Sequence, residues 1–181
     1  MPDFRTIVTA TSSFRISYTD NILMLGSCFT DYIGQRLAQA KLNVCVNPFG
    51  VLFNPESIAT TIERATQQQT LTTDNLLQHN GLWLSLDFHG SFSSADSNTA
   101  LQKMNRAIKQ THQALKHATL IIITFGTSIV YRHTASGHVV ANCHKLPAAN
   151  FTREQLSAEY IADRYSQIIE RLTALSPAVK F

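Results

Sequence analysis

The most constraining feature of this chain is TLIIITF at 119–125, where apolar and β-branched residues follow one another without polar alternation. Such a run is typical of a strand that is covered on both faces in a parallel sheet. Two shorter apolar runs, at 22–25 and 43–46, predict further strands. Apolar residues at helical spacing follow the first run, and a helix-starting proline, Pro55, follows the second. Strands that alternate with helices predict an α/β fold, a three-layer α/β/α arrangement with a mainly parallel sheet.

Later stretches of the chain predict two more helices and a hairpin. Apolar positions at helical spacing indicate a helix over 100–117. Two β-prone runs within 128–143 are separated by Ala-Ser-Gly, which predicts a hairpin. The stretch 152–175 predicts an amphipathic helix that begins at Thr152, because Gln155 completes a capping box three residues later.

Length, charge and hydropathy exclude several classes of protein. A chain of 181 residues can bury one sizeable core, so we expect a single domain over 1–181. The formal charge of +3 comes from scattered lysines and arginines, which argues against a nucleic-acid partner. No apolar stretch approaches the roughly 20 residues that cross a bilayer, and the N-terminus lacks the pattern of a signal peptide. We therefore expect no membrane partner and a cytoplasmic protein.

The cysteines and histidines do not form a metal-binding pattern. Cys28, Cys45 and Cys143 are odd in number and show no Cys-x-x-Cys spacing, which favours free thiols over a disulfide framework. The seven histidines and twelve acidic residues show no pair at i and i+4 with a third ligand nearby. The sequence therefore predicts no metal site and no cofactor.

A Gly-Ser-Cys corner at 26–28 joins the first predicted strand to the helix after it. In a parallel sheet, sites form outside the carboxyl ends of the strands, where helix N-termini present free N–H groups. Ser27 is our first candidate for a nucleophile at this corner, although a serine here can also be an ordinary helix cap. Cys28 is the second, because a helix N-terminus favours the reactive thiolate, although many cysteines are simply buried apolar residues.

The stretch LGSCFTDYIGQRL at 25–37 resembles the signature of the GSCFA domain family, with Thr30 in place of the usual alanine. Three further stretches fit that resemblance: NPFGVLFNPESI at 47–58, TFGTSIVYR at 124–132 and NCHKLP at 142–147. The family is distantly similar to SGNH or GDSL-type hydrolases, which implies a three-layer α/β/α fold and an ester-cleaving serine after the first strand. The third letter of the hydrolases' Gly-Asp-Ser turn falls on Cys28, so Ser27 and Cys28 compete for that role.

The same resemblance implies hydrogen-bond donors for the oxyanion of an acyl-transfer reaction. Gly50 matches the glycine that follows the second strand in SGNH enzymes. Ser128 stands where those enzymes have an asparagine, and the neighbouring Thr127 is an alternative donor. Asn142, in the fourth motif, is a further candidate for substrate binding. Taken singly, Gly50, Thr127 and Ser128 also suit ordinary turns or caps.

A base for the nucleophile is harder to assign. SGNH enzymes use an Asp-x-x-His motif near the C-terminus, and no histidine here has an aspartate three residues before it. Family members generally run beyond 181 residues, so the resemblance implies the N-terminal part of a longer domain that is incomplete at its C-terminus. Within this chain His144 is the candidate base, although a histidine beside a proline-bounded loop is commonly structural.

These observations leave three functional hypotheses open. The first is an SGNH-like esterase or acyl-transfer domain that acts through Ser27 on an O-acyl ester of a small molecule or glycan. The second is a non-catalytic module that binds a carbohydrate or acyl ligand. The third is a cysteine-dependent acyltransferase that uses Cys28. The sequence predicts no oligomeric state.

Overall fold

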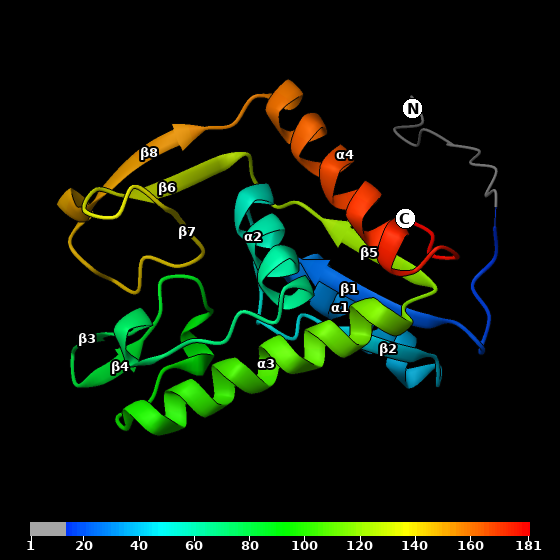
Figure 1. Cartoon of the computed structure of the whole chain (residues 1–181), viewed down its shortest axis with the longest axis horizontal. Helices are drawn as coiled ribbons and strands as arrows, with labels where there is room; N and C mark the ends of the chain where they lie inside the picture. Colours follow the sequence, from blue (N-terminus) through cyan, green and yellow to red (C-terminus); the bar gives the residue numbers. More distant parts are fainter. Residues whose placement is uncertain (1–13) are drawn as a thin grey trace, which may run out of the picture.

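A parallel three-stranded sheet forms the centre of the computed structural model, which describes residues 14–181 (Figure 1). The strand order is β2-β1-β5, where β1 is Asn21–Gly26, β2 is Asn43–Val46 and β5 is Leu120–Thr124. In this register Leu23 of β1 lies opposite Cys45 on one side and Ile121 on the other. The three strands predicted from the apolar runs, and their parallel direction, are confirmed.

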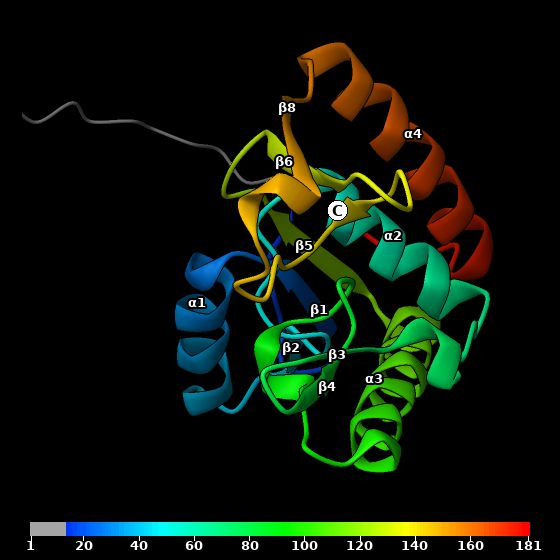
Figure 2. The same ribbon diagram turned by 90° about the vertical axis from the view of Figure 1, so that its left-hand side faces the viewer.

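Helices lie on both faces of this sheet, as Figure 2 shows. One face is covered by α1 (Cys28–Gln39), and the other by α2 (Pro55–Thr66), α3 (Ser97–His117) and α4 (Ala158–Leu175). Alternate residues of β1 point to opposite faces, as a pleated strand requires. Met24 packs with residues of α1, whereas Leu23 and Leu25 belong to the larger core that α2, α3 and α4 complete.

Local signals set the starts of two long helices. Asn54 caps α2 by accepting a hydrogen bond from the Ser57 N–H at 2.8 Å, and Pro55 occupies its first position. Asp96 caps α3 in the same way, through the Thr99 N–H at 2.7 Å. Both helices match the predicted ones closely. No helix within residues 14–181 is both long enough and apolar enough to span a membrane.

Two small antiparallel sheets extend the fold away from the parallel one. The first pairs β3 (Leu77–His79) with β4 (Leu82–Leu84), and the second has the order β7-β6-β8. Its strands are β6 (Ile129–His133), β7 (Val139–Val140) and β8 (Phe151–Gln155), and short 3₁₀ turns lie at Thr73–Asn75, Gly90–Phe92 and Ala148–Asn150. The antiparallel pairing of β6 with β7 confirms the predicted hairpin.

The helix predicted to begin at Thr152 was placed wrongly at its start. Residues 151–155 form β8, which pairs with β6 along five positions, and Arg132 supports this pairing through Glu154 at 2.9 Å. The helix begins at Ala158, where Ser157 caps it by accepting from the Tyr160 N–H at 3.1 Å. The capping-box pattern involves only neighbouring residues. Pairing with β6 supplies hydrogen-bond partners to the backbone of 151–155 from a distant segment, and it is this pairing that makes the stretch a strand.

The strand β5 is covered less completely than its sequence predicts. Its first two residues, Leu120 and Ile121, are buried, while the three that follow are half-buried. On the side away from β1, Leu120 pairs with Lys180 in a parallel bridge, and the Ile121 N–H donates to the Lys180 carbonyl at 2.9 Å. The order of segments across the sheet is therefore β2, β1, β5 and the stretch around Lys180.

Candidate active site

The Gly-Ser-Cys corner lies at the carboxyl end of β1, where three strands of the parallel sheet come together. Gly26 has a φ of 145°, and a Cβ atom there would lie 2.2 Å from the Thr124 carbonyl oxygen, so only glycine fits. Its N–H donates to Asn47 Oδ1 at 2.8 Å, and its carbonyl accepts from the Leu52 N–H at 2.9 Å. The ends of β1, β2 and β5 are thus linked at one position.

Ser27 is buried at this corner, with 7% of its surface exposed. It occupies the cap position before α1, but its side chain does not cap that helix. The Ser27 hydroxyl instead lies 3.1 Å from Thr124 Oγ1, and the Ser27 N–H donates to the same oxygen at 3.2 Å. The side chain of the first candidate nucleophile therefore points toward β5.

The Thr124 hydroxyl is a shared partner that the sequence did not single out. Besides its two contacts with Ser27, it lies 2.6 Å from the hydroxyl of Thr30, which is fully buried. A hydroxyl can donate once and accept twice, so the Thr124 hydroxyl can serve three polar groups of two residues, Ser27 and Thr30. Both threonines lie in stretches that resemble the family, yet only the fold brings them together.

Asn47 supports the corner from the end of β2. It adopts a left-handed backbone with a φ of 40°, and its Nδ2 donates to Asp31 Oδ1 on α1 while its Oδ1 accepts from Gly26. One buried amide therefore joins the first strand, the second strand and the first helix. In the sequence, Asn47 is seen only as an asparagine before a proline at the end of a strand. That pattern indicates a turn, and it does not predict that the Asn47 side chain joins two strands and a helix.

Cys28 differs from Ser27 in that it is exposed. It is the first residue of α1, next to the free N–H groups of the helix's first turn. Cys45 and Cys143 are partly buried, and burial raises the pKa of both thiols. All three cysteines are free, as expected, and Cys28 is the one that a reagent or substrate can reach most readily.

Two candidate oxyanion donors, Thr127 and Ser128, lie in the segment after β5, where their hydroxyls already have other partners. The segment after β5 touches the corner, because a Cβ at Gly126 would lie 3.4 Å from Ser27 Cβ. Thr127 Oγ1, however, accepts from the Ile129 N–H at 3.0 Å, and Ser128 Oγ lies 3.4 Å from the side-chain amide of Gln155. Both hydroxyls thus help to start β6.

Gly50 lies in the loop between β2 and α2. Its φ of 81° is in the left-handed region, and its N–H donates to the Asn47 carbonyl at 2.7 Å. A Cβ at this position would lie 2.5 Å from the Cβ of His89, so the lack of a side chain at Gly50 allows the two loops to pack closely. The Gly50 N–H closes a turn in this structure, which is the ordinary role of a glycine after Asn-Pro.

His144 and Asn142 form a structural unit that is hydrogen-bonded to the 85–88 loop. The Nε2 atom of His144 lies 2.9 Å from the Ser85 carbonyl oxygen and 3.1 Å from that of Phe88, while Asn142 Oδ1 accepts from the His144 N–H at 2.8 Å. Burial lowers the pKa of His144, which keeps the imidazole neutral with Nε2 as donor. His144 therefore holds the 85–88 loop.

Within residues 14–181, no histidine side chain is hydrogen-bonded to Ser27 or Cys28, and no group of three metal-binding side chains comes together. The corner thus combines a buried hydroxyl, an exposed thiol and the amino end of a helix. These are the parts of a site that could accept an acyl group, together with the positive end of a helix dipole.

Comparison with known proteins supports the resemblance seen in the sequence. The model of the GSCFA family matches residues 21–181, which includes every helix and strand described above. No curated protein and no solved structure matches the chain. Because the match spans nearly the whole chain and contains the Gly-Ser-Cys corner, the protein belongs to the GSCFA family.

Proposed function

We propose that this protein carries an acyl-transfer or ester-hydrolysing site of the SGNH type, with its nucleophile at the Gly26–Ser27–Cys28 corner. The observation that carries the proposal is the position of that corner. It lies where β1 ends and α1 begins, beside the backbone of Gly126 at the end of the neighbouring strand. The parallel order β2-β1-β5 with helices on both faces supports an SGNH-like three-layer arrangement.

The proposed substrate is an O-acyl ester of a small molecule or glycan. The nucleophile attacks the acyl carbonyl carbon, the bond to the ester oxygen breaks, and the alcohol leaves with a proton. Water then cleaves the acyl-enzyme to a carboxylic acid and restores the nucleophile, or an acceptor alcohol takes the acyl group. The free N–H groups in the first turn of α1 are suited to stabilise the oxyanion that forms during attack.

Exposure favours the thiol of Cys28 as the attacking group. An acyl carbonyl must reach the nucleophile, and Cys28 is exposed while the Ser27 hydroxyl is turned to Thr124 at 3.1 Å. In this version Ser27 is a positioning residue that anchors the corner to β5. Attack by Ser27 itself is the alternative, and it requires the hydroxyl to leave Thr124.

Labelling with a fluorophosphonate probe and with iodoacetamide, followed by peptide mapping, distinguishes the two nucleophiles. We expect iodoacetamide to modify Cys28 faster than Cys45 or Cys143, whose thiol pKa values are raised by burial. We also expect Cys28→Ala to lower the hydrolysis of a p-nitrophenyl ester by about 10²-fold or more, as loss of a main catalytic group does. Cys143→Ala is the matched control and should retain activity.

The possible outcomes separate the versions of this proposal. Fluorophosphonate label on Ser27, with activity lost in Ser27→Ala and kept in Cys28→Ala, would reverse the assignment and leave the ester chemistry in place. Label on neither residue, together with no ester turnover, would contradict the enzymatic proposal itself. Circular dichroism of each variant shows whether a loss of activity reflects a loss of fold.

A further inference from the structure

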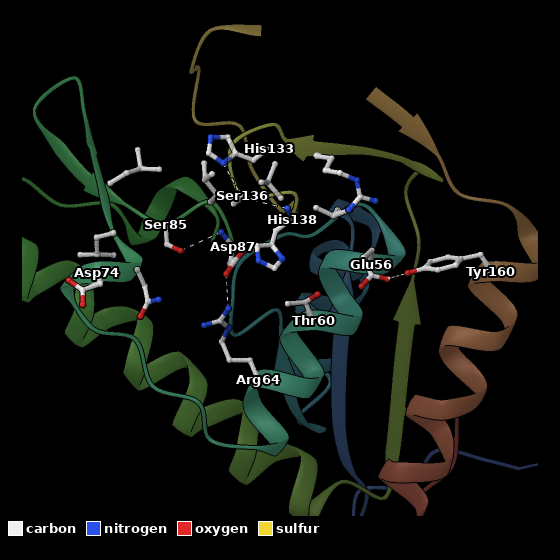
Figure 3. A pocket seen from close by; sticks show the side chains of 17 residues that line it. Glu56, Thr60, Arg64, Asp74, Ser85, Asp87, His133, Ser136, His138 and Tyr160 are labelled. Atoms are coloured by element: carbon white, nitrogen blue, oxygen red, sulfur yellow. Dashed lines mark hydrogen bonds and ion pairs between the residues drawn. The ribbon is translucent and has the colours of Figure 1, made fainter. Parts of the chain in front are cut away.

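A pocket of about 600 Å³ with both polar and apolar lining residues lies beside α2. Figure 3 shows Thr60 and Arg64 of α2 on one side of this pocket, with Asp87 and His138 facing them. Its volume falls within the range of roughly 300–1,000 Å³ that is usual for small-molecule sites. Neither Ser27 nor Cys28 lines it. The pocket is therefore a site of its own.

An ion pair lies across this pocket. Arg64 Nη2 is 2.6 Å from Asp87 Oδ2, and the two side chains are 17% and 31% exposed. A guanidinium carries five N–H donors and a carboxylate has about four acceptor positions, so one contact leaves most of both groups available. Arg64 and Asp87 thus hold each other in place and still offer planar donors and acceptors to a ligand.

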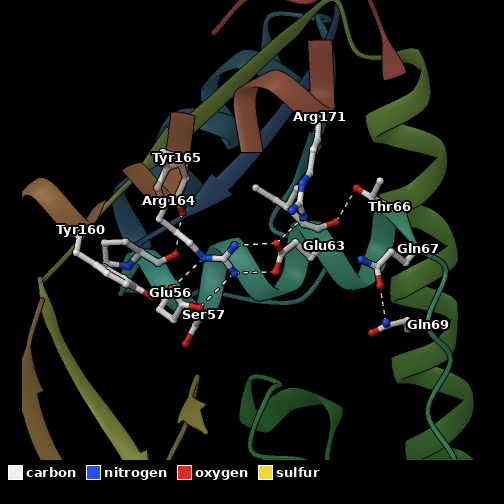
Figure 4. A network of polar contacts seen from close by, with 12 residues as sticks. Glu56, Ser57, Glu63, Thr66, Gln67, Gln69, Tyr160, Arg164, Tyr165 and Arg171 are labelled. Carbon is white, nitrogen blue, oxygen red and sulfur yellow. Dashed lines mark hydrogen bonds and ion pairs between the residues drawn. The ribbon is translucent and has the colours of Figure 1, made fainter. Parts of the chain in front are cut away.

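Glu56 and Arg132 of the pocket are also paired, whereas Asp74 has no ion-pair partner within residues 14–181. Glu56 accepts from the Tyr160 hydroxyl at 2.9 Å and from Arg164 Nε at 3.2 Å (Figure 4). Arg132 donates to Glu154 at 2.9 Å. Each arginine that lines the pocket therefore already has a carboxylate partner. An anionic ligand would have to displace one of those carboxylates, whereas a neutral polar ligand would not.

Uncharged polar groups add to the lining. Within residues 14–181, the hydroxyl of Thr60 and the imidazole of His138 have no hydrogen-bond partner, and both lie on the pocket. A hydroxyl and a neutral imidazole can each donate and accept, which matches the hydroxyl groups of a polyol. The lining thus combines two kinds of groups besides the unpaired Asp74 carboxylate: paired charges, and free groups that both donate and accept.

A buried hydroxyl next to the pocket has no partner among the described residues. Ser57 is 95% buried, and its Oγ makes no hydrogen bond there. It lines a small cavity of about 10 Å³ that shares Thr60, Arg64 and Asp87 with the large pocket. That volume is close to the space for one water molecule, so a hydroxyl or water could satisfy Ser57 from the pocket side.

From these features we infer that the pocket binds a neutral, hydroxyl-rich ligand, namely a mono- or disaccharide, held by Arg64, Asp87 and Thr60. Sugar hydroxyls both donate and accept, so they can use the free positions of the ion pair without disrupting it. This binding goes beyond the chemistry proposed at Cys28 and does not depend on it. His144 affects sugar binding indirectly, because its imidazole holds the 85–88 loop that carries Asp87.

Titration of the ¹⁵N-labelled chain, followed by amide chemical shifts, tests this inference. The probes are maltose, cellobiose and N,N′-diacetylchitobiose as neutral sugars, with inorganic phosphate and octanoate as charged and apolar comparisons. We expect at least one neutral sugar to shift the amides of Thr60, Arg64 and Asp87, with a Kd of about 1 mM or lower. The same shifts should appear in Cys28→Ala, which separates this inference from the proposed enzymatic function.

Two threonines of the same helix provide a matched pair of variants. Thr60→Val removes a hydroxyl that faces the pocket and should weaken sugar binding about threefold to tenfold. Thr66→Val removes a hydroxyl that donates to the Ile62 carbonyl, away from this pocket, and should leave binding unchanged. Unchanged thermal unfolding of both variants shows that the fold is retained.

Three results would overturn the inference. The first is that none of the three neutral sugars shifts the pocket amides at about 10 mM, well above the expected Kd. The second is that only phosphate or octanoate shifts them. The third is that Thr60→Val and Thr66→Val bind a sugar equally well, which would remove Thr60 from the site and with it the assignment of the pocket.

Discussion

The hydroxyl of Thr124 lies 3.1 Å from that of Ser27 and accepts the Ser27 N–H at 3.2 Å. We expect Thr124→Val to destabilise the protein by about 1–3 kcal/mol, because valine has a similar shape but leaves that N–H without its acceptor. Thr124→Ser keeps the hydroxyl and should cost less. Urea unfolding measures both variants, and equal midpoints for valine and wild type would show that the hydroxyl cluster does not hold the corner.

Gly26 tolerates no side chain. Gly26→Ala should lower the free energy of unfolding by about 3 kcal/mol or more, because the new Cβ would meet the Thr124 carbonyl oxygen at 2.2 Å and the backbone φ is 145°. Gly81→Ala is the matched control. Its φ is 75° and a Cβ there would have no atom within 4 Å, so we expect about 1–2 kcal/mol. Similar costs for the two would contradict the close approach of β1 and β5.

Arg164 joins α4 to α2 by donating to both Glu56 and Glu63, and its Nη2 lies 2.7 Å from Glu63 Oε2. Hydrogen bonds from Arg164 are the main reason that the pKa of Glu63 is lowered in the folded state. The folded protein therefore binds fewer protons than the unfolded chain. The resulting stability is complete above the ordinary glutamate pKa of 4.5 and is lost as the pH falls below it, through the folded value.

The variant Arg164→Met should remove this part of the pH dependence. We expect wild type and variant to differ most at neutral pH, by about 1–3 kcal/mol, and to converge as the pH falls below about 4. Guanidinium unfolding at several pH values measures the difference. Glu154→Gln breaks an exposed pair on β8 and should stay close to wild type. A constant difference between wild type and Arg164→Met at all pH values would contradict the linkage to Glu63.

His144 should stabilise the protein only while it is neutral. Burial is the largest cause that lowers its pKa, so the folded state binds fewer protons than the unfolded state. Its contribution is therefore complete above the ordinary histidine pKa of 6.5 and declines as the pH falls below that value. His144→Gln should flatten this decline, as measured by urea unfolding between about pH 7.5 and 5.5. An unchanged slope would show that the imidazole is free to protonate in the folded state.

The same variant also tests the role of His144 at the candidate site. As a structural residue that holds the 85–88 loop, it should affect stability and sugar binding more than ester turnover. A large fall in turnover, with stability unchanged, would restore His144 as the base that its sequence position suggested.

Much of the central fold could be predicted because the signals are local. The apolar runs of β1, β2 and β5 and the cap and proline of α2 act within a few residues of the element that they specify. The start of α4 could not be predicted in this way. The stretch 151–155 resembles a helix start, but pairing with β6, whose residues lie 18 to 26 positions earlier in the chain, makes it a strand.

The sequence by itself determined that a glycine corner with a hydroxyl and a thiol separates the first strand from the first helix, and that the chain belongs to the GSCFA family. Only the tertiary structure decided which side chain faces solvent. Ser27 turns inward because the Thr124 hydroxyl, 97 residues further along the chain, lies beside it when β5 pairs with β1, and Cys28 stays exposed. Such a choice depends on packing between distant segments, which local sequence patterns do not encode.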